Sequence, residues 1–408
     1  MENKGRLKGH STPVLSTALN QDGSHLASGA SNAVVRIFDL ASLVCSHSLS
    51  LPVAPSSEHQ LGTNNHDHNF IEGDNEDQDI ASLAWRNSHS LLAAVGCHLI
   101  HVDLRANPHS TPVRIFTAND CIADIALNPL NDAYISLADD TGSLSILDIR
   151  RLPTTTPPPK LFKSLSAAHS NMASACAYDP RPESNPWHVW SAGFDYTLQR
   201  WDTSNGCQVE CIDLSSTTAA ATSDVHEQGQ IQSINPPFVY SLALSARSSR
   251  IAAGLGNGAV ALLRRGAGVV PAGAKKKKTR PCVLDAVMPG VHAWSCTAVQ
   301  FWDPDRVMGV GGAATETDNV GSDEVVVTGG LDGRVNVIGF TVGLLDENSV
   351  PAVKGTWNVE RKVDSMICLG QGEAKSGRSV RIAVAGCPTA KTRDPAVFGA
   401  IDLWDIPV

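Results

Sequence analysis

A cysteine and two histidines lie close together at Cys97, His98 and His101, and these residue types are the usual ligands of zinc. Zinc takes about four ligand atoms, and the sequence offers no fourth ligand nearby. The surrounding residues favour a β-strand, in which His98 and His101 point to opposite faces. We therefore expect no metal site here. The ten cysteines follow no metal-binding spacing, which indicates free thiols in a reducing compartment.

A glycine-rich segment, GLGNGA at residues 254–259, is similar to the phosphate-binding loop of dinucleotide-binding proteins. That loop must lead into a helix, whereas the residues after Ala259 favour a strand. We interpret the segment as a hairpin turn. No combination of nucleophile, histidine and acid stands out, although scattered residues could still form one. We expect a protein that is not an enzyme and that uses no cofactor.

The charge of the chain narrows the range of partners. Its 408 residues carry a formal net charge of −9, which argues against a surface built throughout for nucleic acid. One basic run could act as a nuclear import signal or touch phosphates weakly, with a solvated loop as the alternative. The run consists of Lys275, Lys276, Lys277, Lys278 and Arg280.

The sequence shows no signal peptide and no apolar stretch of the roughly 18–20 residues that a membrane span requires. We expect a monomer in the cytoplasm and/or nucleus, with proteins as partners and no contact with a membrane. Nucleic acid is expected at most as a weak ligand of the basic run.

The chain is built from seven similar units. Each unit holds three short β-rich runs with Gly, Asn or Asp between the second and third, and the link to the next unit can supply a fourth strand. Four-stranded sheets repeated radially form a β-propeller, which leaves no long open edge. We predict one all-β, seven-bladed propeller over residues 1–408. The expected blades are 9–50, 79–117, 120–166, 169–214, 237–270, 292–350 and 363–408 plus 1–8.

The N-terminal strand is expected to join the last blade and so close the ring. Unit seven ends only three residues after Trp404 and Asp405, so its fourth strand must come from elsewhere in the chain. The long average spacing of the units requires insertions between the strands. We expect these at 51–78, 215–236, 266–291 and 309–323.

The units resemble WD repeats over nearly the whole chain. The dipeptide Trp-Asp occurs three times, and we expect the first and the last, at Trp201 and Trp404, to end a third strand. By its distance from His292, Trp302 should end a first strand instead. The other units carry Phe, Leu or Ile where the Trp of the repeat is usual.

The WD-repeat resemblance implies a buried hydrogen-bonded tetrad in unit four. Its members are His169, Ser191, Asp195 and Trp201. Each such buried bond contributes about 1 kcal/mol net, and more is lost when one partner is removed. Unit six retains a partial set, which consists of His292, Thr328 and Asp332, with Ile338 at the Trp position.

Two neighbouring units end in Asp-x-Arg, one with Asp103 and Arg105 and the other with Asp148 and Arg150. This ending resembles the Trp-Asp-x-Arg of WD-repeat substrate receptors of cullin-4 ubiquitin ligases, in which the Asp and Arg help bind the damaged-DNA-binding adaptor. Here Val or Leu replaces the Trp. The resemblance implies a non-catalytic scaffold that docks to the adaptor and presents a substrate protein. The alternative function is a scaffold of another nuclear or cytosolic assembly linked to chromatin or RNA. The alternative role of the Asp-x-Arg pairs is contact with neighbouring blades only.

Overall fold

The structure is a computed structural model. It describes residues 1–52, 78–105, 112–152, 159–182, 184–215, 235–265, 281–302, 324–340, 351–359, 361–371, 379–388 and 399–408. This part of the chain consists of strands, turns and irregular links, without an α-helix. Accordingly, none of it is a helix that could cross a membrane.

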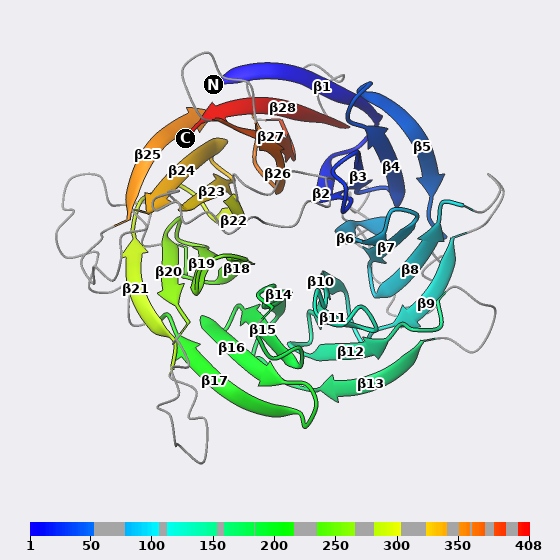
Figure 1. Cartoon of the computed structure of the whole chain (residues 1–408), viewed down its shortest axis with the longest axis vertical. Helices are drawn as coiled ribbons and strands as arrows, with labels where there is room; N and C mark the ends of the chain where they lie inside the picture. Colours follow the sequence, from blue (N-terminus) through cyan, green and yellow to red (C-terminus); the bar gives the residue numbers. More distant parts are fainter. Residues whose placement is uncertain are drawn as a thin grey trace, which may run out of the picture.

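The described residues form 28 strands in seven antiparallel sheets of four strands each. Figure 1 shows the sheets arranged radially around a common axis, with the first strand of each blade nearest the centre. The prediction of a seven-bladed β-propeller is therefore confirmed.

The strands of the first four blades follow one another in chain order, from the inner edge to the outer edge. Blade one consists of β2 (Val14–Leu19), β3 (His25–Ala30), β4 (Val34–Asp39) and β5 (Val44–Ser50). Blade two consists of β6 (Ile80–Asn87), β7 (Ser90–Val95), β8 (His98–Asp103) and β9 (Val113–Thr117). Blade three consists of β10 (Ile122–Leu127), β11 (Tyr134–Asp139), β12 (Leu144–Asp148) and β13 (Lys160–Leu165). Blade four consists of β14 (Ala173–Tyr178), β15 (His188–Gly193), β16 (Thr197–Asp202) and β17 (Cys207–Asp213).

The last three blades complete the ring. Blade five consists of β18 (Val239–Leu244), β19 (Arg250–Leu255), β20 (Val260–Arg264) and β21 (Val283–Met288). Blade six consists of β22 (Cys296–Trp302), β23 (Glu324–Gly330), β24 (Arg334–Phe340) and β25 (Ala352–Asn358). Blade seven consists of β26 (Ser365–Gln371), β27 (Ser379–Ala385), β28 (Gly399–Pro407) and β1 (Glu2–His10).

The ring closes where the two ends of the chain meet in one sheet. Strand β1 pairs antiparallel with β28, from Glu2 opposite Asp405 to His10 opposite Gly399. The closing strand is thus the first one of the chain, as predicted, and Figure 1 shows both termini in blade seven.

The hydrophobic core is divided among the seven gaps between neighbouring blades. Each gap contains a cluster of buried apolar side chains drawn from the two blades that border it. Between blades seven and one, for example, Leu7 and Ile401 pack with Val14, Leu26 and Phe38. No blade buries its faces alone, which ties the stability of each blade to its two neighbours.

Two of the predicted blade boundaries are wrong. Strand β21 lies inside the insertion expected at 266–291, so blade five ends at Met288 and not at residue 270. Strand β25 begins beyond residue 350, the expected end of blade six. Both are outer strands in which every position is exposed or half-buried, so the alternation of apolar residues that reveals a strand is weak.

The antiparallel order divides the turns between two faces of the ring. The upper face carries the turns between second and third strands and the links between blades, such as 194–196 and 166–172. The lower face carries the turns between first and second strands and between third and fourth strands, such as 179–187 and 203–206.

Candidate functional site

The tetrad of blade four forms a continuous chain of hydrogen bonds. Nδ1 of His169 lies 3.0 Å from Oδ1 of Asp195, and its Nε2 lies 2.7 Å from the hydroxyl of Ser191. The indole Nε1 of Trp201 donates to the same hydroxyl at 3.2 Å. The His169 side chain is completely buried, whereas Trp201 is only half-buried. These residues connect the link before the blade to its second and third strands, which is a structural role.

Several donors converge on the Asp195 carboxylate. Burial alone raises the pKa of Asp195, but hydrogen bonds from His169, Thr197 and the Ser170 amide outweigh it and lower the pKa to about 2. Gly193 makes room for this arrangement, because a Cβ on it would lie 2.4 Å from Nδ1 of His169. The turn therefore requires glycine for its close packing against the imidazole.

Blade six repeats this arrangement without a tryptophan. Nδ1 of His292 lies 3.1 Å from Oδ1 of Asp332, and its Nε2 lies 2.9 Å from the hydroxyl of Thr328. Ile338 sits opposite Val326 in the sheet and is fully buried, so an apolar contact replaces the indole bond.

Blade one keeps the histidine but has no carboxylate beside it. Nε2 of His10 lies 2.7 Å from the hydroxyl of Ser28, while its buried Nδ1 has no hydrogen-bond partner among the described residues. The amide of Asn32 donates to Ser11 instead. Burial, assisted by the positive charge of Arg36, lowers the pKa of His10 to about 4. His10 is therefore neutral in the folded protein near neutral pH.

The two Asp-x-Arg endings have the same local geometry. In blade two, Nε and Nη2 of Arg105 donate to the two oxygens of Asp103 at 3.1 and 2.9 Å. In blade three, Nε of Arg150 donates to Oδ1 of Asp148 at 2.9 Å, and its Nη2 donates to Oδ2. In each pair the arginine backbone amide also donates to the aspartate, at 3.0 and 3.1 Å.

Both pairs follow a third strand and therefore lie on the lower face, on adjacent blades. The arginine side chains are 63% and 64% exposed, and the aspartates 19% and 18%. Neither arginine binds an acidic group of a neighbouring blade among the described residues. Each pair is thus a preformed, solvent-facing fork that can accept a further partner.

A third Asp-x-Arg pair, Asp179 and Arg181, is not predicted from the sequence. Nε and Nη2 of Arg181 donate to Asp179 at 3.1 and 2.8 Å, but this pair follows a first strand and is largely buried. Nη1 of Arg265, from blade five, lies 2.5 Å from the same carboxylate. In the sequence, Asp179 and Arg181 are part of a DPR turn, and nothing there indicates that Arg265 contacts the Asp179 carboxylate. The pair joins two blades and has a structural role.

The residues considered as metal ligands have other contacts. The buried His101 lies 2.8 Å from the Ser90 hydroxyl through Nε2, and Nδ1 of His98 lies 3.2 Å from the Thr117 hydroxyl. The GLGNGA segment forms the end of β19 and the turn that leads to β20, so it belongs to a hairpin. The basic run at 275–280 lies outside the described residues.

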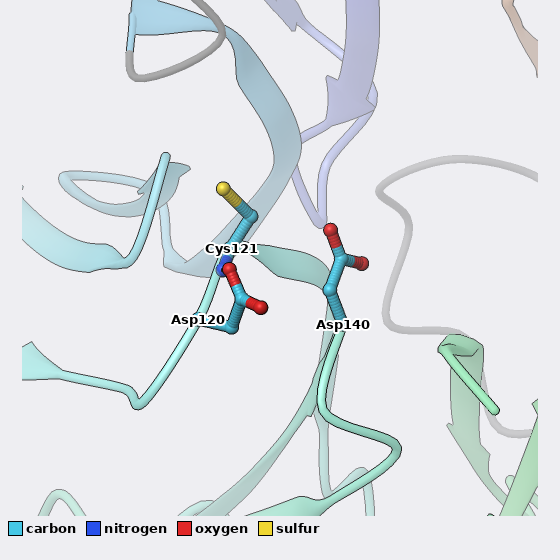
Figure 2. A group of neighbouring side chains, drawn as sticks. All are labelled: Asp120, Cys121 and Asp140. Atoms are coloured by element: carbon cyan, nitrogen blue, oxygen red, sulfur yellow. The ribbon is translucent and has the colours of Figure 1, made fainter. Parts of the chain in front are cut away.

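Another group, Asp120, Cys121 and Asp140, brings three ligand-type atoms within 4.8 Å of one another. Figure 2 shows these residues on two adjacent segments of blade three. The backbone of Asp140 donates to the Cys121 carbonyl at 3.0 Å, which explains why the segments are close. Three ligands of this kind are fewer than the roughly four of a zinc site.

Comparison with known proteins agrees with the fold. Residues 1–39 match the family model described as WD domain, G-beta repeat. The chain therefore carries a WD repeat in this segment. It is 21% identical over 272 residues to the WD repeat-containing protein 53 homolog of Dictyostelium discoideum.

That match covers 63% of this chain and 63% of the relative's length. The segment 168–202, with its DPRPESN turn, also resembles WD repeat-containing protein 53. WD-repeat propellers are generally non-catalytic scaffolds that bind proteins.

Proposed function

We propose that this protein is a non-catalytic substrate receptor of a cullin-4 ubiquitin ligase and docks to the damaged-DNA-binding adaptor through its lower face. The observation that carries the proposal is the matched pair of forks on adjacent blades, Asp103 with Arg105 and Asp148 with Arg150. The substrate protein then binds elsewhere on the ring.

The geometry of the forks suits recognition of a protein surface. Each aspartate holds its arginine in one orientation through two or more charge-assisted bonds. Pre-ordering of this kind lowers the side-chain entropy that is lost on binding. Nη1 of each arginine makes no hydrogen bond with a described residue, so it can donate to a carbonyl or carboxylate of the partner.

The decisive test is the affinity of the purified protein for the purified adaptor. We expect Arg105→Ala and Arg150→Ala each to weaken binding, with the stronger effect about tenfold, and the double variant to weaken it further. Arg334→Ala is the matched control, because Arg334 is 46% exposed, faces Asp332 and lies on the upper face. Absence of binding by the unaltered protein, or equal binding by all variants, contradicts the proposal.

The alternative is a scaffold of another nuclear or cytosolic assembly linked to chromatin or RNA. Its support is the basic run at residues 275–280. We propose a cytoplasmic and/or nuclear location on the same ground. Fluorescently tagged protein with Lys275, Lys276, Lys277 and Lys278 changed to Ala tests this, since loss of nuclear signal is expected only if the run is an import signal.

A further inference from the structure

Three aromatic side chains from two blades meet beside one of the two forks. The ring of Tyr134 lies 5.0 Å from that of Phe162 and 5.1 Å from that of Trp187, and the Phe162 and Trp187 rings stack at 5.8 Å. Tyr134 begins β11, Phe162 lies in β13, and Trp187 lies in the lower-face turn before β15. We call these three residues the aromatic cluster.

An irregularity of the outer strand places Phe162 in this cluster. In blade three, Ile146 is opposite Lys163 while Leu147 is opposite Leu161, so Phe162 is the extra residue of a β-bulge. A bulge changes the direction of one side chain relative to the regular strand. Phe162 remains 38% exposed and the adjacent Leu161 43% exposed.

The next blade provides a natural comparison. Strand β17 has the same bulge, with Val209 as the extra residue between Gln208 and Glu210. Val209 is 36% exposed, so it matches Phe162 in position and exposure. It differs in being aliphatic, whereas Phe162 contributes a ring to the aromatic cluster. The bulge is therefore a feature of the repeat, whereas the aromatic cluster belongs to blades three and four.

The cluster is continuous with the blade-three fork. The guanidinium of Arg150 lies over the Tyr134 ring, 5.8 Å from its centre. Within the described residues, no aromatic ring has a corresponding contact with Arg105. The two forks thus share their ion-pair geometry but differ in their surroundings. Apolar surface that borders an ordered arginine is typical of the residues that dominate binding energy.

Positive charge lies on the side of the cluster toward blade two, although the chain as a whole is acidic. Apart from the two forks, the lower and outer parts of blades two and three carry Arg86, Arg114, Arg151 and Lys160, against the single carboxylate of Asp132. Each fork is electrically neutral. The net charge of this region is therefore positive, and it complements an acidic surface.

We propose that the aromatic cluster and Arg150 form the anchor at which the adaptor docks, by receiving an apolar side chain that is bordered by carboxylates. Phe162 and Trp187 contact the apolar group, Arg150 donates to an adjacent carboxylate or carbonyl, and the surrounding cations attract the acidic rim. The Asp103–Arg105 fork lies outside this anchor and contributes less. This inference rests on the proposed function and assigns unequal weight to the two forks.

The test measures the affinity of the purified adaptor for purified variants with unchanged thermal midpoints. We expect Phe162→Ala to weaken binding at least tenfold and Val209→Ala to change it less than twofold. Arg150→Ala is expected to weaken binding more than Arg105→Ala. Lys160→Glu should lower the association rate, with a smaller effect at high salt, because it acts through long-range attraction.

The outcomes separate the two proposals. If the unaltered protein binds the adaptor but Phe162→Ala binds equally well, the anchor is wrong and the receptor proposal stands. If the unaltered protein does not bind the adaptor, the receptor proposal fails and the anchor fails with it. If Phe162→Ala lowers the thermal midpoint, Phe162→Leu serves as the folded variant in its place. The anchor is then overturned if Phe162→Leu binds the adaptor as well as the unaltered protein does and the two arginine variants weaken binding equally.

Discussion

Arg361 and Asp402 form a buried ion pair in which Nε of the arginine lies 2.7 Å from Oδ2 of the aspartate. Arg361 lies in the link that precedes β26, whereas Asp402 lies in β28, so the pair connects two parts of blade seven. The other oxygen of Asp402 accepts from Arg6 of β1. One carboxylate therefore binds the link, the last strand and the first strand at the point of ring closure.

Replacement of Asp402 by Asn should destabilise the protein by about 3–5 kcal/mol, because it leaves the Arg361 charge buried without its counter-charge. Thermal unfolding measures the effect, and hydrogen exchange of the β1 amides reports whether closure is lost first. Arg6→Ala should have a smaller effect, since Arg6 is 31% exposed. A thermal midpoint for Asp402→Asn equal to that of the unaltered protein would show that the ion pair is not needed for closure.

The blade-four tetrad predicts a graded response at Trp201. Trp201→Phe keeps most of the packing and removes the bond to Ser191, at a cost of about 1 kcal/mol. Trp201→Ala also removes the ring and should cost about 2–4 kcal/mol, below the usual value for a fully buried tryptophan. The comparison of the two melting curves checks this order. Identical curves for all three proteins contradict the tetrad.

The close packing at Gly193 predicts that a single methyl group is harmful there. Gly193→Ala places a Cβ against the imidazole of His169 and should displace it from Asp195, at a cost of about 1–3 kcal/mol. The thermal midpoint of Gly193→Ala measures the loss. A crystal structure of the variant with the His169–Asp195 bond intact is the result that excludes this explanation.

His10 should make the protein sensitive to acid. Its pKa is about 4 when folded, compared with about 6.5 when unfolded, so the unfolded chain takes up the proton first. The free energy of unfolding is therefore highest above pH 6.5. It falls as the pH drops toward 4, by about 3 kcal/mol in total. We expect His10→Gln to show a smaller fall in melting temperature between pH 7 and 4 than the unaltered protein. Parallel pH profiles for the two proteins count against a neutral buried His10.

The forks should contribute to binding and not to stability. Arg105→Ala and Arg150→Ala each remove an exposed charge, and exposed ion pairs contribute little to folding. Both variants should therefore melt at the temperature of the unaltered protein. A clear fall in the melting temperature of either variant assigns that arginine a structural role.

The inner strands and the ring closure can be predicted from sequence because they depend on local signals. Strands such as β7 and β19 are short apolar runs between turn residues, and the stretch before His10 is a strand candidate that belongs to no other unit. The outer strands β21 and β25 have one face toward solvent, so their composition approaches that of loops. Their position becomes clear only when the neighbouring third strand is in place.

The site is harder to predict because its residues meet across units. The two forks are visible in the sequence, since Asp and Arg are two residues apart. The aromatic cluster joins Tyr134, Phe162 and Trp187, and nothing in their spacing shows that a bulge brings them together. Similarly, Arg265 reaches Asp179 from another blade. Contacts of this kind depend on packing, which a single sequence does not encode in a readable pattern.

The pairing of β1 with β28 also dictates an order of events during translation. The ribosome produces β1 before the other strands of the propeller, whereas its partner strand β28 emerges after all of them. The N-terminal strand must therefore wait with its hydrogen-bonding edge open while blades one to six form beside it. Contacts so distant in the chain form slowly, and open strand edges invite association with other chains. A nascent chain of this protein is thus most exposed to aggregation until β28 has left the ribosome and paired with β1.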